Sequence, residues 1–363
     1  MDDQEKDKTY FGYYGMLVHQ QNMLMDNVRT SLYQRAILSN APDFAGKVVL
    51  DVGTGTGILS FFAAQAGARR VYAVEASSMA NYAEKLAAAN GYGDVVRIIR
   101  GKIEDITIDE KIDIIVSEPM GVLLVHERML ESYLTARKRF LPSQGLSSQM
   151  YPSGGNILLA PFSDIGLYAE TLSKISFWQN RNFHNIDISP LLGAAADMQF
   201  AQPVVGPIDP KLLLSSPNAH FLDFCSLEPS ELEHFEMRLT LEIGHTGICH
   251  GLAGWFDVSF TGSIKSYLLS TGPSDERTHW QHVRFLFPKP SAVNRGQFLK
   301  GAMEFKANDQ RSYDLFLRLT LHSTSEEATI IKVRQRYSLQ DQQYWNIQGP
   351  SFSDVPKEHF GIY

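Results

Sequence analysis

Two glutamates in the stretch SEPMGVLLVHERMLES, residues 117–132, are the first candidates for chemistry. Glu118 follows the apolar run IDIIV and Glu127 follows a second apolar stretch, so both carboxylates lie beside sequence that predicts a buried core. Because an ionised carboxylate loses its hydration on burial, such acids need a cationic or hydrogen-bonding partner. Taken singly, Glu118 could cap a helix and Glu127 could stabilise a first helical turn. As a pair, they predict a site that binds a cation.

The cation that best fits two carboxylates is a guanidinium. It stays protonated at neutral pH and presents a planar fork of N–H donors that matches carboxylate oxygens. In that state it is a poor nucleophile, because the nitrogen lone pairs are delocalised over the group. Carboxylates that hold the other N–H groups would draw positive charge away from one terminal nitrogen and orient it. The predicted acceptor is therefore a protein arginine.

A glycine loop in VVLDVGTGTGILS lies where a first strand turns into a first helix, and it indicates the second ligand. Its glycines are Gly53, Gly55 and Gly57, whereas a dinucleotide fingerprint would place the third glycine at Ile58. Asp51 lies in the same turn, where a carboxylate would repel a pyrophosphate. The spacing and the acid favour a ligand without phosphate and with a positive charge, such as S-adenosylmethionine.

Two later acids support this cofactor. Glu75 closes the second predicted strand about twenty residues after the loop, where an acid accepts hydrogen bonds from both ribose hydroxyls. Glu104, in GKIEDI after the third predicted strand, is expected to bind the adenine amino group. The glycines alone would only permit a tight turn, and the ordered set of loop and acids decides for S-adenosylmethionine.

Short apolar strands that alternate with amphipathic helices position these residues. The strands are KVVLDV, RVYAVE, VVRIIR and IDIIVS, and the helices are ILSFFAAQAG, SSMANYAEKLAAAN and ERMLESYLTARKRFL. This alternation predicts an α/β fold with a parallel, doubly wound sheet, whose strand carboxyl ends face the ligand crevice.

The second half of the chain has a different pattern. From residue 156 onward, short strands separated by Gly, Pro and Ser predict an antiparallel β-barrel or sandwich, interrupted by a more helical segment at about 168–200. The expected divisions are N-terminal helices at 1–46, a cofactor domain at 47–150, a barrel domain at 151–340 and a tail at 341–363.

Composition limits the remaining classes of function. The 363 residues are 44% hydrophobic, carry a net charge of −7 and include two cysteines, Cys225 and Cys249, which exclude a disulfide framework. The acidic balance does not favour nucleic acid and is compatible with a basic polypeptide partner. No signal peptide or apolar run long enough for a membrane span is visible, and no metal-ligand cluster surrounds either cysteine. We therefore expect no direct nucleic-acid partner, no membrane contact and no metal.

The chain resembles the protein arginine N-methyltransferases over about residues 10–337. The motifs that carry the resemblance are YFGYY (10–14), MLMDNVRT (23–30), VVLDVGTGTG (48–57), VEAS (74–77), SEPMG…HERMLES (117–132) and THW (278–280). The resemblance implies a Rossmann-like methyltransferase domain, then a β-barrel with an inserted helical arm that makes a head-to-tail homodimer. It further implies S-adenosylhomocysteine as product, histone tails and other transcription or RNA-processing proteins as substrates, and a location in nucleus and cytoplasm.

The same resemblance assigns roles to individual residues. Phe11 and Tyr14 are expected to form an aromatic lid over the cofactor, and Arg29 to pair with the cofactor carboxylate. His279 is expected to pair with Asp26 on the substrate side and to relay the released proton. The full set of implied cofactor-binding residues is Phe11, Tyr14, Gln20, Met23, Arg29, Asp51, Gly53, Gly55, Glu75, Glu104 and Ser132, and the implied catalytic residues are Glu118, Glu127, His279 and Asp26.

Particular residues also indicate a type and a branch. Met23 and Met129 match methionines beside the active site of type I enzymes, which make asymmetric dimethylarginine. Pro119, Gln20 and the runs ERMLESY and GLAGWFDVSF favour the coactivator-associated (type 4) branch.

Two residues of the loop that carries Glu118 and Glu127, here called the two-glutamate loop, depart from the pattern of this branch. Val122 stands where most members have tyrosine, and His126 stands where the branch has asparagine. Both departures bear on peptide preference.

The predicted reaction is a direct displacement in which the arginine nitrogen attacks the sulfonium methyl and neutral S-adenosylhomocysteine leaves. Three alternatives were weighed. A non-catalytic scaffold is disfavoured because every position that the chemistry needs is filled, and a nicotinamide oxidoreductase fails on the glycine spacing. An enzyme of the same fold for a small molecule or nucleic acid is disfavoured because the paired acids repel phosphate-rich substrates.

Overall fold

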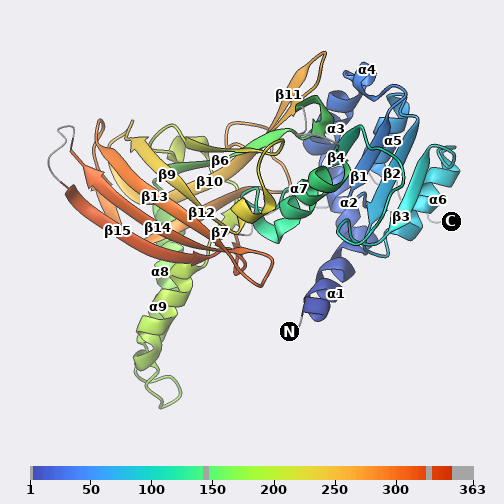
Figure 1. Cartoon of the computed structure of the whole chain (residues 1–363). Coiled ribbons are helices and arrows are strands. Elements are labelled where there is room, and N and C mark those ends of the chain that lie inside the picture. Colours follow the sequence, from blue (N-terminus) through green and yellow to red (C-terminus); the bar gives the residue numbers. More distant parts are fainter. Residues whose placement is uncertain (1–2, 142–146, 324–328, 346–363) are drawn as a thin grey trace, which may run out of the picture.

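The computed structural model describes residues 3–141, 147–323 and 329–345 of the chain. Its N-terminal part is a series of helices that leads into the first sheet (Figure 1). These are α1 (Asp3–Tyr14), α2 (Leu17–Met25), α3 (Asn27–Leu38) and α4 (Ala41–Phe44). The side chain of Asp26 accepts from the backbone N–H of Arg29 and caps α3, which explains why a new helix begins directly after α2.

The cofactor domain contains a five-stranded sheet in the order β3-β2-β1-β4-β5, and all of its strand pairs are parallel. Every residue of β1 is buried, although alternate side chains point to opposite faces, so both faces of this strand are covered. The strands are β1 (Val48–Val52), β2 (Arg70–Glu75), β3 (Val96–Arg100), β4 (Ile114–Ser117) and β5 (Met150–Tyr151), and the helices are α5 (Ile58–Gln65), α6 (Ala80–Ala89) and α7 (Met129–Phe140). The predicted Rossmann-like fold is confirmed.

The second domain is a barrel-like pair of sheets that lies beside the first domain (Figure 1). One sheet has the order β16-β7-β12-β10-β6-β8, with β11 added to β10, and the other has the order β15-β14-β13-β9. The strands are β6 (Gly154–Phe162), β7 (Val204–Gly206), β8 (Asn218–Asp223), β9 (His234–Glu242), β10 (Gly247–Thr261), β11 (Ser266–Ser270), β12 (His282–Val293), β13 (Phe298–Ala307), β14 (Tyr313–His322), β15 (Thr329–Ser338) and β16 (Gln343–Tyr344). All of their pairs are antiparallel except β16 with β7, which confirms the predicted second domain.

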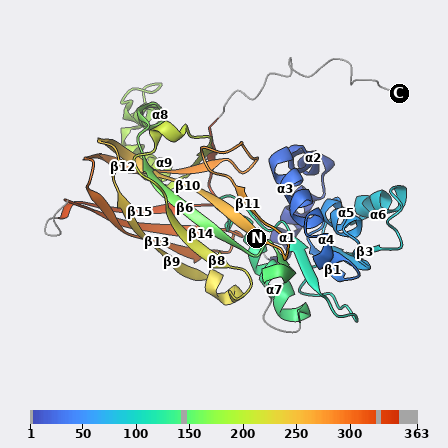
Figure 2. The ribbon, with the colours of Figure 1, turned by 90° about the horizontal axis from the view of Figure 1, so that it is seen from above.

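Helices α8 (Ile165–Ser176) and α9 (Leu192–Ala201) form an arm that projects from the barrel, away from the parallel sheet (Figures 1 and 2). The arm coincides with the helical segment predicted at about 168–200. It carries large apolar side chains that stay exposed in a single chain, among them Ile165 and Met198, each 70% exposed. Such a surface is typical of a protein interface.

The barrel continues past its predicted end. Gln343 and Tyr344, which we expected to belong to a tail, form β16 and pair with Val204 and Val205 of β7. Trp345 follows and donates from its indole Nε1 to Glu170 of α8 at 3.0 Å. Residues 346–363 of the predicted tail lie outside the described part of the chain.

Candidate active site

A cavity of about 1070 Å³ lies at the carboxyl ends of β1, β2 and β4, and residues of α1 and α2 line it as well. The barrel closes one side of it through His279, Trp280, Arg311 and Tyr344. Its lining includes most of the predicted site residues: Phe11, Tyr14, Gln20, Met23, Arg29, Gly53, Gly55, Glu75, Glu104, Glu118, Glu127, Met129, Ser132 and His279. Asp26 and Asp51 do not line the cavity.

Glu127 projects into this cavity below α1. Its Oε2 accepts hydrogen bonds from the hydroxyls of Tyr14 at 2.5 Å and Tyr10 at 3.2 Å. Burial, together with repulsion by Glu118, raises the pKa of the Glu127 carboxyl, and the bond from Tyr14 opposes this shift only in part. The resemblance assigns Tyr14 to the cofactor lid, and here its hydroxyl also holds the second glutamate.

Glu118 is held by a cation of the same chain. Its Oε2 lies 3.0 Å from both Nε and Nη2 of Arg29, and its Oε1 accepts from the backbone N–H of Met120 at 3.2 Å. Both side chains of the pair are more than nine-tenths buried. The resemblance pairs Arg29 with the cofactor carboxylate, so the structure adds a partner that the sequence did not indicate. One carboxylate oxygen of Glu118 thus contacts the Nε–Nη2 edge of the Arg29 guanidinium.

The loop that carries both glutamates has an unusual backbone. Leu123, Leu124, Glu127 and Arg128 have φ angles of 55°, 71°, 73° and 57°, a region that side chains rarely adopt. Gly121 allows the chain to fold back on itself, since a Cβ there would lie 2.0 Å from the carbonyl oxygen of His126. Strained residues of this kind persist where the surroundings fix them, often at functional sites.

The two departures from the branch pattern lie in this loop. Val122 lines the cavity. His126 is directed toward the barrel, where its Nδ1 lies 2.9 Å from the hydroxyl oxygen of Ser312. Burial lowers the pKa of His126 to about 4, so the imidazole is neutral at physiological pH. Val122 therefore borders the site directly, and His126 contributes to the contact between the domains.

The glycine loop and Glu75 form a cradle that fits a nucleoside. The two carboxylate oxygens of Glu75 accept from the backbone N–H groups of Gly55 and Ser77, both at 2.8 Å, and keep further lone pairs for hydroxyls. Gly53 and Gly55 have φ angles of 68° and 57°. A Cβ at Gly55 would lie 2.8 Å from Oε1 of Gln20, so a side chain there would crowd the cavity wall.

Asp51, predicted from its place beside the glycine loop to bind the cofactor, does not line the cavity. It is fully buried beneath the loop, where its Oδ2 accepts from the hydroxyls of Thr54 at 2.6 Å and Ser60 at 2.7 Å. Burial raises the pKa of this carboxyl to about 6. Asp51 thus fixes the glycine loop from below and makes no direct contact with the cavity. Glu104 lines the cavity and accepts from the Ser132 hydroxyl at 2.6 Å.

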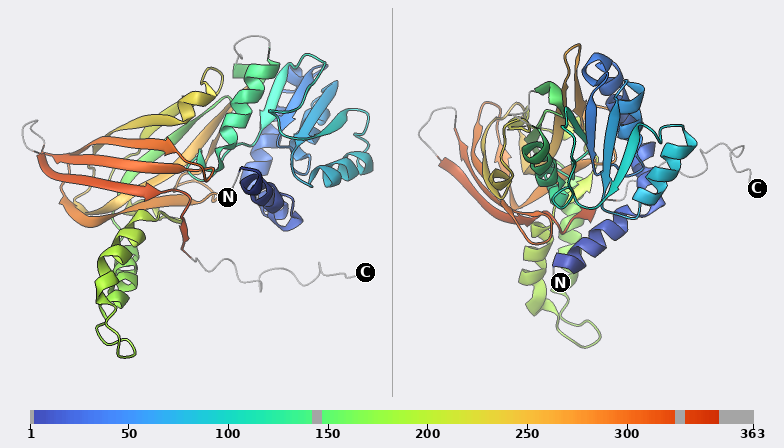
Figure 3. Two further views of the ribbon diagram at one scale, coloured as in Figure 1. Left: turned by 60° about the horizontal axis from the view of Figure 1, so that its bottom comes forward. Right: turned by 45° about the vertical axis from the view of Figure 1, so that its right-hand side comes forward.

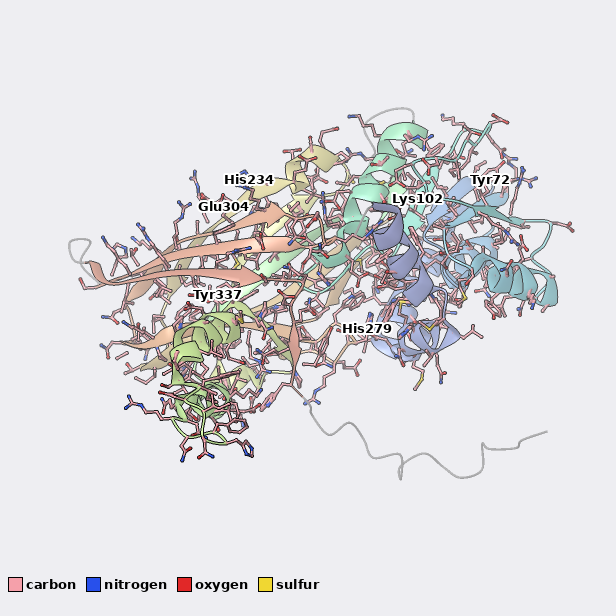
Figure 4. The ribbon with its side chains drawn as sticks, turned by 90° about the horizontal axis from the view of Figure 1, so that it is seen from below. Tyr72, Lys102, His234, His279, Glu304 and Tyr337 are labelled. Carbon is pink, nitrogen blue, oxygen red and sulfur yellow. The ribbon has the colours of Figure 1, made fainter. Side chains whose placement is uncertain are left out.

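His279 and Asp26 meet across the two domains, as the resemblance implied. Oδ2 of Asp26 lies 2.7 Å from Nδ1 of His279 and accepts from its backbone N–H at 2.9 Å. His279 is labelled in Figure 4. Burial alone would raise the pKa of Asp26, but the hydrogen bonds from His279 and from the N–H of Arg29 outweigh it and hold this pKa below its ordinary value. Nε2 of His279 is left as the ring atom that can act toward the cavity.

Several lining residues were not found from the sequence. Tyr10 is part of YFGYY, but no signal separated it from its aromatic neighbours. Trp280, which donates from its indole to the carbonyl of Met120 at 2.8 Å, is part of THW and could have been found from its motif. Arg311 and Tyr344 lie in barrel segments with no motif, and only the fold brings them to the cavity.

Comparisons with known proteins agree with this site. Residues 49–145 match a methyltransferase domain, and residues 156–326 match the arginine methyltransferase oligomerization subdomain. The structure of Arabidopsis thaliana protein arginine methyltransferase 10 is 31% identical, with a TM-score of 0.83 over 90% of this chain and 99% of that one. The chain belongs to the protein arginine methyltransferase family. A chain of the Trypanosoma brucei PRMT1 enzyme-prozyme heterotetrameric complex with AdoHcy is also 31% identical, with a TM-score of 0.78 and the same coverage.

Curated relatives of this arginine methyltransferase family member place it within a branch. Probable histone-arginine methyltransferase 1.3 of Arabidopsis thaliana is 48% identical over 86% of this chain and 58% of the relative. Histone-arginine methyltransferase CARMER of Drosophila persimilis is 47% identical over 87% of this chain and 59% of the relative. The chain spans about three fifths of the length of these relatives. The predicted family and its coactivator-associated branch are confirmed.

Proposed function

We propose that this protein is an S-adenosylmethionine-dependent protein arginine N-methyltransferase of type I. The proposed substrates are arginines of histones, in line with the names of its relatives, and of other transcription or RNA-processing proteins. The observation that carries the proposal is the convergence of Glu118 and Glu127 on one cavity that the glycine loop and Glu75 also line. The two glutamates that would hold a guanidinium (the guanidinium clamp) therefore line the same cavity as the loop and Glu75 that would hold a nucleoside.

The residues of the cradle fit S-adenosylmethionine. Glu75 would accept from the ribose hydroxyls, Glu104 would bind the adenine, and Arg29 and Gln20 would hold the amino-acid end, with Phe11 above. The cofactor supplies a methyl group on a positively charged sulfur. Its two positive charges match the acidic lining, and its lack of phosphate matches the glycine spacing. Among the described residues there is no cluster of His, Cys, Asp and Glu that could hold a metal.

The acceptor side is built to orient a guanidinium rather than to deprotonate it. Glu118 and Glu127 would hold the N–H groups that do not react and leave one terminal nitrogen directed at the cradle. Tyr14 and Tyr10 keep Glu127 in place through their hydroxyls. Asp26 fixes the ring of His279, whose Nε2 would take up the proton that the substrate nitrogen loses. A cofactor and a substrate that fill the cavity would exclude water from it, which would strengthen each of these charge interactions.

One experiment tests the proposal. The protein is incubated with methyl-labelled S-adenosylmethionine and a histone mixture, and the methylarginine isomer is identified by mass spectrometry. Labelled monomethylarginine and asymmetric dimethylarginine are the expected products. Symmetric dimethylarginine would contradict the type I assignment, and cofactor binding without any labelled arginine would favour a non-catalytic scaffold.

The pH dependence of the reaction should reflect Glu127. Because burial and Glu118 raise the pKa of this carboxyl, it takes up a proton at a higher pH than an ordinary glutamate and then no longer attracts the guanidinium. We expect kcat/KM for a histone peptide to fall as the pH decreases through that raised pKa. Cofactor affinity measured by calorimetry over the same range is the control. A rate that falls only at the pH where an ordinary glutamate takes up its proton would contradict the raised pKa of Glu127, and a rate that does not fall there either would show that Glu127 does not act in its ionised form.

We also propose that two copies associate through the arm. The exposed apolar side chains of α8 and α9 have counterparts on the N-terminal helices, where Leu17, Val18 and Met25 are 52%, 56% and 70% exposed. An arm of one copy that covers the helices of the other would bury both surfaces. In such a homodimer the covered helices are those that form the lid of the cavity.

A further inference from the structure

The turn between β13 and β14, residues 308–312, is a part of the barrel to which no motif or relative assigns a role. It lies at the end of the barrel that faces the parallel-sheet domain, beside α1 (Figures 1 and 3). Within the turn, Oδ1 of Asn308 accepts from the backbone N–H groups of Gln310 at 3.0 Å and Ser312 at 3.2 Å. Arg311 has a φ of 51°, in the left-handed region that side-chain-bearing residues rarely adopt. The turn is thus braced by its own hydrogen bonds.

One set of contacts joins this turn to α1, the helix that carries Phe11 and Tyr14 and is called the lid helix below. The guanidinium of Arg311 forms an ion pair with Asp7 of α1, and Asp7 also pairs with Lys102, which follows β3 in the parallel-sheet domain. Lys102 is labelled in Figure 4. The same guanidinium lies over the rings of Tyr10 and Phe11, 4.6 Å and 5.7 Å from their centroids. Asp7 therefore connects the two domains through α1, and Arg311 holds the helix by charge and by cation–π contact.

A second set of contacts joins the turn to the two-glutamate loop. Ser312 bonds to His126 as described above, and the carbonyl of Asn308 accepts from Nη1 of Arg128 at 3.4 Å. Arg128 also donates from Nε to Glu131 at 2.7 Å. These partners flank Glu127, whose own side chain points the other way, into the cavity.

The backbone of Glu127 and Arg128 makes these contacts necessary. Two consecutive side-chain-bearing residues with φ near 73° and 57° form an unfavourable conformation that must be over-determined by surrounding contacts. Three side-chain contacts hold His126 and Arg128 on either side of Glu127: the ion pair of Arg128 with Glu131, the hydrogen bond of Arg128 to Asn308 and the bond of His126 to Ser312. Two of these three end on the β13–β14 turn, and Glu127 itself is held by Tyr14 and Tyr10.

We propose that the β13–β14 turn is a positioning element of the site, in which Arg311 fixes the lid helix over the cofactor cradle and Asn308 and Ser312 fix the loop that carries Glu127. Only the part of this inference that concerns methyl transfer rests on the proposed function. Arg311 holds the lid helix through its contacts with Asp7, Tyr10 and Phe11. Arg128 links the turn to the backbone next to Glu127. Because Tyr10 and Tyr14 of the lid helix also hold Glu127, loss of Arg311 should weaken both cofactor binding and methyl transfer, whereas loss of the loop contacts should affect methyl transfer alone.

The first test replaces Arg311 with glutamine and measures S-adenosylhomocysteine binding by calorimetry. We expect the Kd to rise by about tenfold, because the charged contact to Asp7 and the stacking on the lid are lost together. Arg311→Lys, which keeps the charge, should recover part of the affinity. Arg318→Gln is the matched control, since Arg318 is exposed on β14 and pairs with Glu236 at 2.9 Å, away from the cavity. An unchanged Kd for Arg311→Gln would overturn the proposal for the lid.

The second test replaces Arg128 with glutamine and separates kcat from cofactor affinity. We expect kcat to fall by about tenfold or more while the Kd for S-adenosylhomocysteine stays unchanged, because Glu127 is misplaced and the cradle is not touched. A melting temperature within a few degrees of wild type shows that the fold is kept. Normal kcat would overturn the role of the loop contacts. If the wild-type protein methylates no arginine, the proposed function is wrong. The effect of Arg311→Gln on S-adenosylhomocysteine binding then still tests whether the turn holds the lid helix.

Discussion

Replacing Glu127 with glutamine should reduce methyl transfer by on the order of a hundredfold to a thousandfold. The amide keeps the size of the side chain and can still accept from the hydroxyls of Tyr14 and Tyr10, so the geometry is retained and only the charge is lost. A guanidinium held by one carboxylate instead of two is less well oriented and keeps more of its positive charge on the reacting nitrogen. Steady-state rates with a histone peptide at saturating cofactor measure the effect.

The stability of this variant provides an internal control. Because burial raises the pKa of Glu127, its ionisation above that pKa opposes folding, so removal of the charge should leave the melting temperature unchanged or raise it. The Kd for S-adenosylhomocysteine should also be unchanged. Glu84→Gln is the matched surface substitution, since Glu84 pairs with Arg100 on the exposed side of α6. Normal turnover by the Glu127→Gln enzyme would disprove the proposal that Glu127 and Glu118 together hold the substrate guanidinium.

Much of the fold could be predicted because its signals are local. Apolar runs separated by helices of regular length indicate a parallel sheet, and the glycine loop marks where the first strand meets the first helix. The end of the barrel could not be predicted in this way. β16 is a strand of two residues, Gln343 and Tyr344, whose only pairing is with β7 far back in the sequence. A strand of that length has no periodicity to detect.

The site shows the same division between local and distant information. Glu118, Glu127 and Glu75 were found because each follows a recognisable strand or loop, and all of them line the cavity. Asp51 was placed in the turn, but it lies within β1, and its side chain is directed beneath the glycine loop to the hydroxyls of Thr54 and Ser60. Arg311 was missed because its importance comes from α1, three hundred residues away in the sequence.

A second set of residues could be located from sequence but not paired. Arg29 and Glu118 are both predicted site residues, and nothing in their motifs indicates that they form an ion pair. Long-range charge pairs depend on how helices and strands pack, which a single sequence does not encode locally. The pair has a direct consequence for stability.

Replacing Glu118 with glutamine should reduce both the rate and the stability of the protein. Loss of the carboxylate weakens the grip on the substrate guanidinium, with a rate loss on the order of a hundredfold or more. It also leaves the guanidinium of Arg29 buried without its anion, which should lower the free energy of unfolding by about 3 kcal/mol. Chemical denaturation at pH 7 and steady-state rates measure the two effects. The loss of stability distinguishes Glu118 from Glu127, whose charge opposes folding.

The double variant Glu118→Gln with Arg29→Met separates the two roles of Glu118. Removal of the unpaired guanidinium should restore much of the lost stability, because an apolar side chain of similar length does not need a counter-ion. The rate should remain low, since neither the clamp nor the cation at the amino-acid end of the cofactor is present. A single Glu118→Gln variant as stable as wild type would contradict the buried pair. Recovery of the rate in the double variant would show that Glu118 serves only to neutralise Arg29.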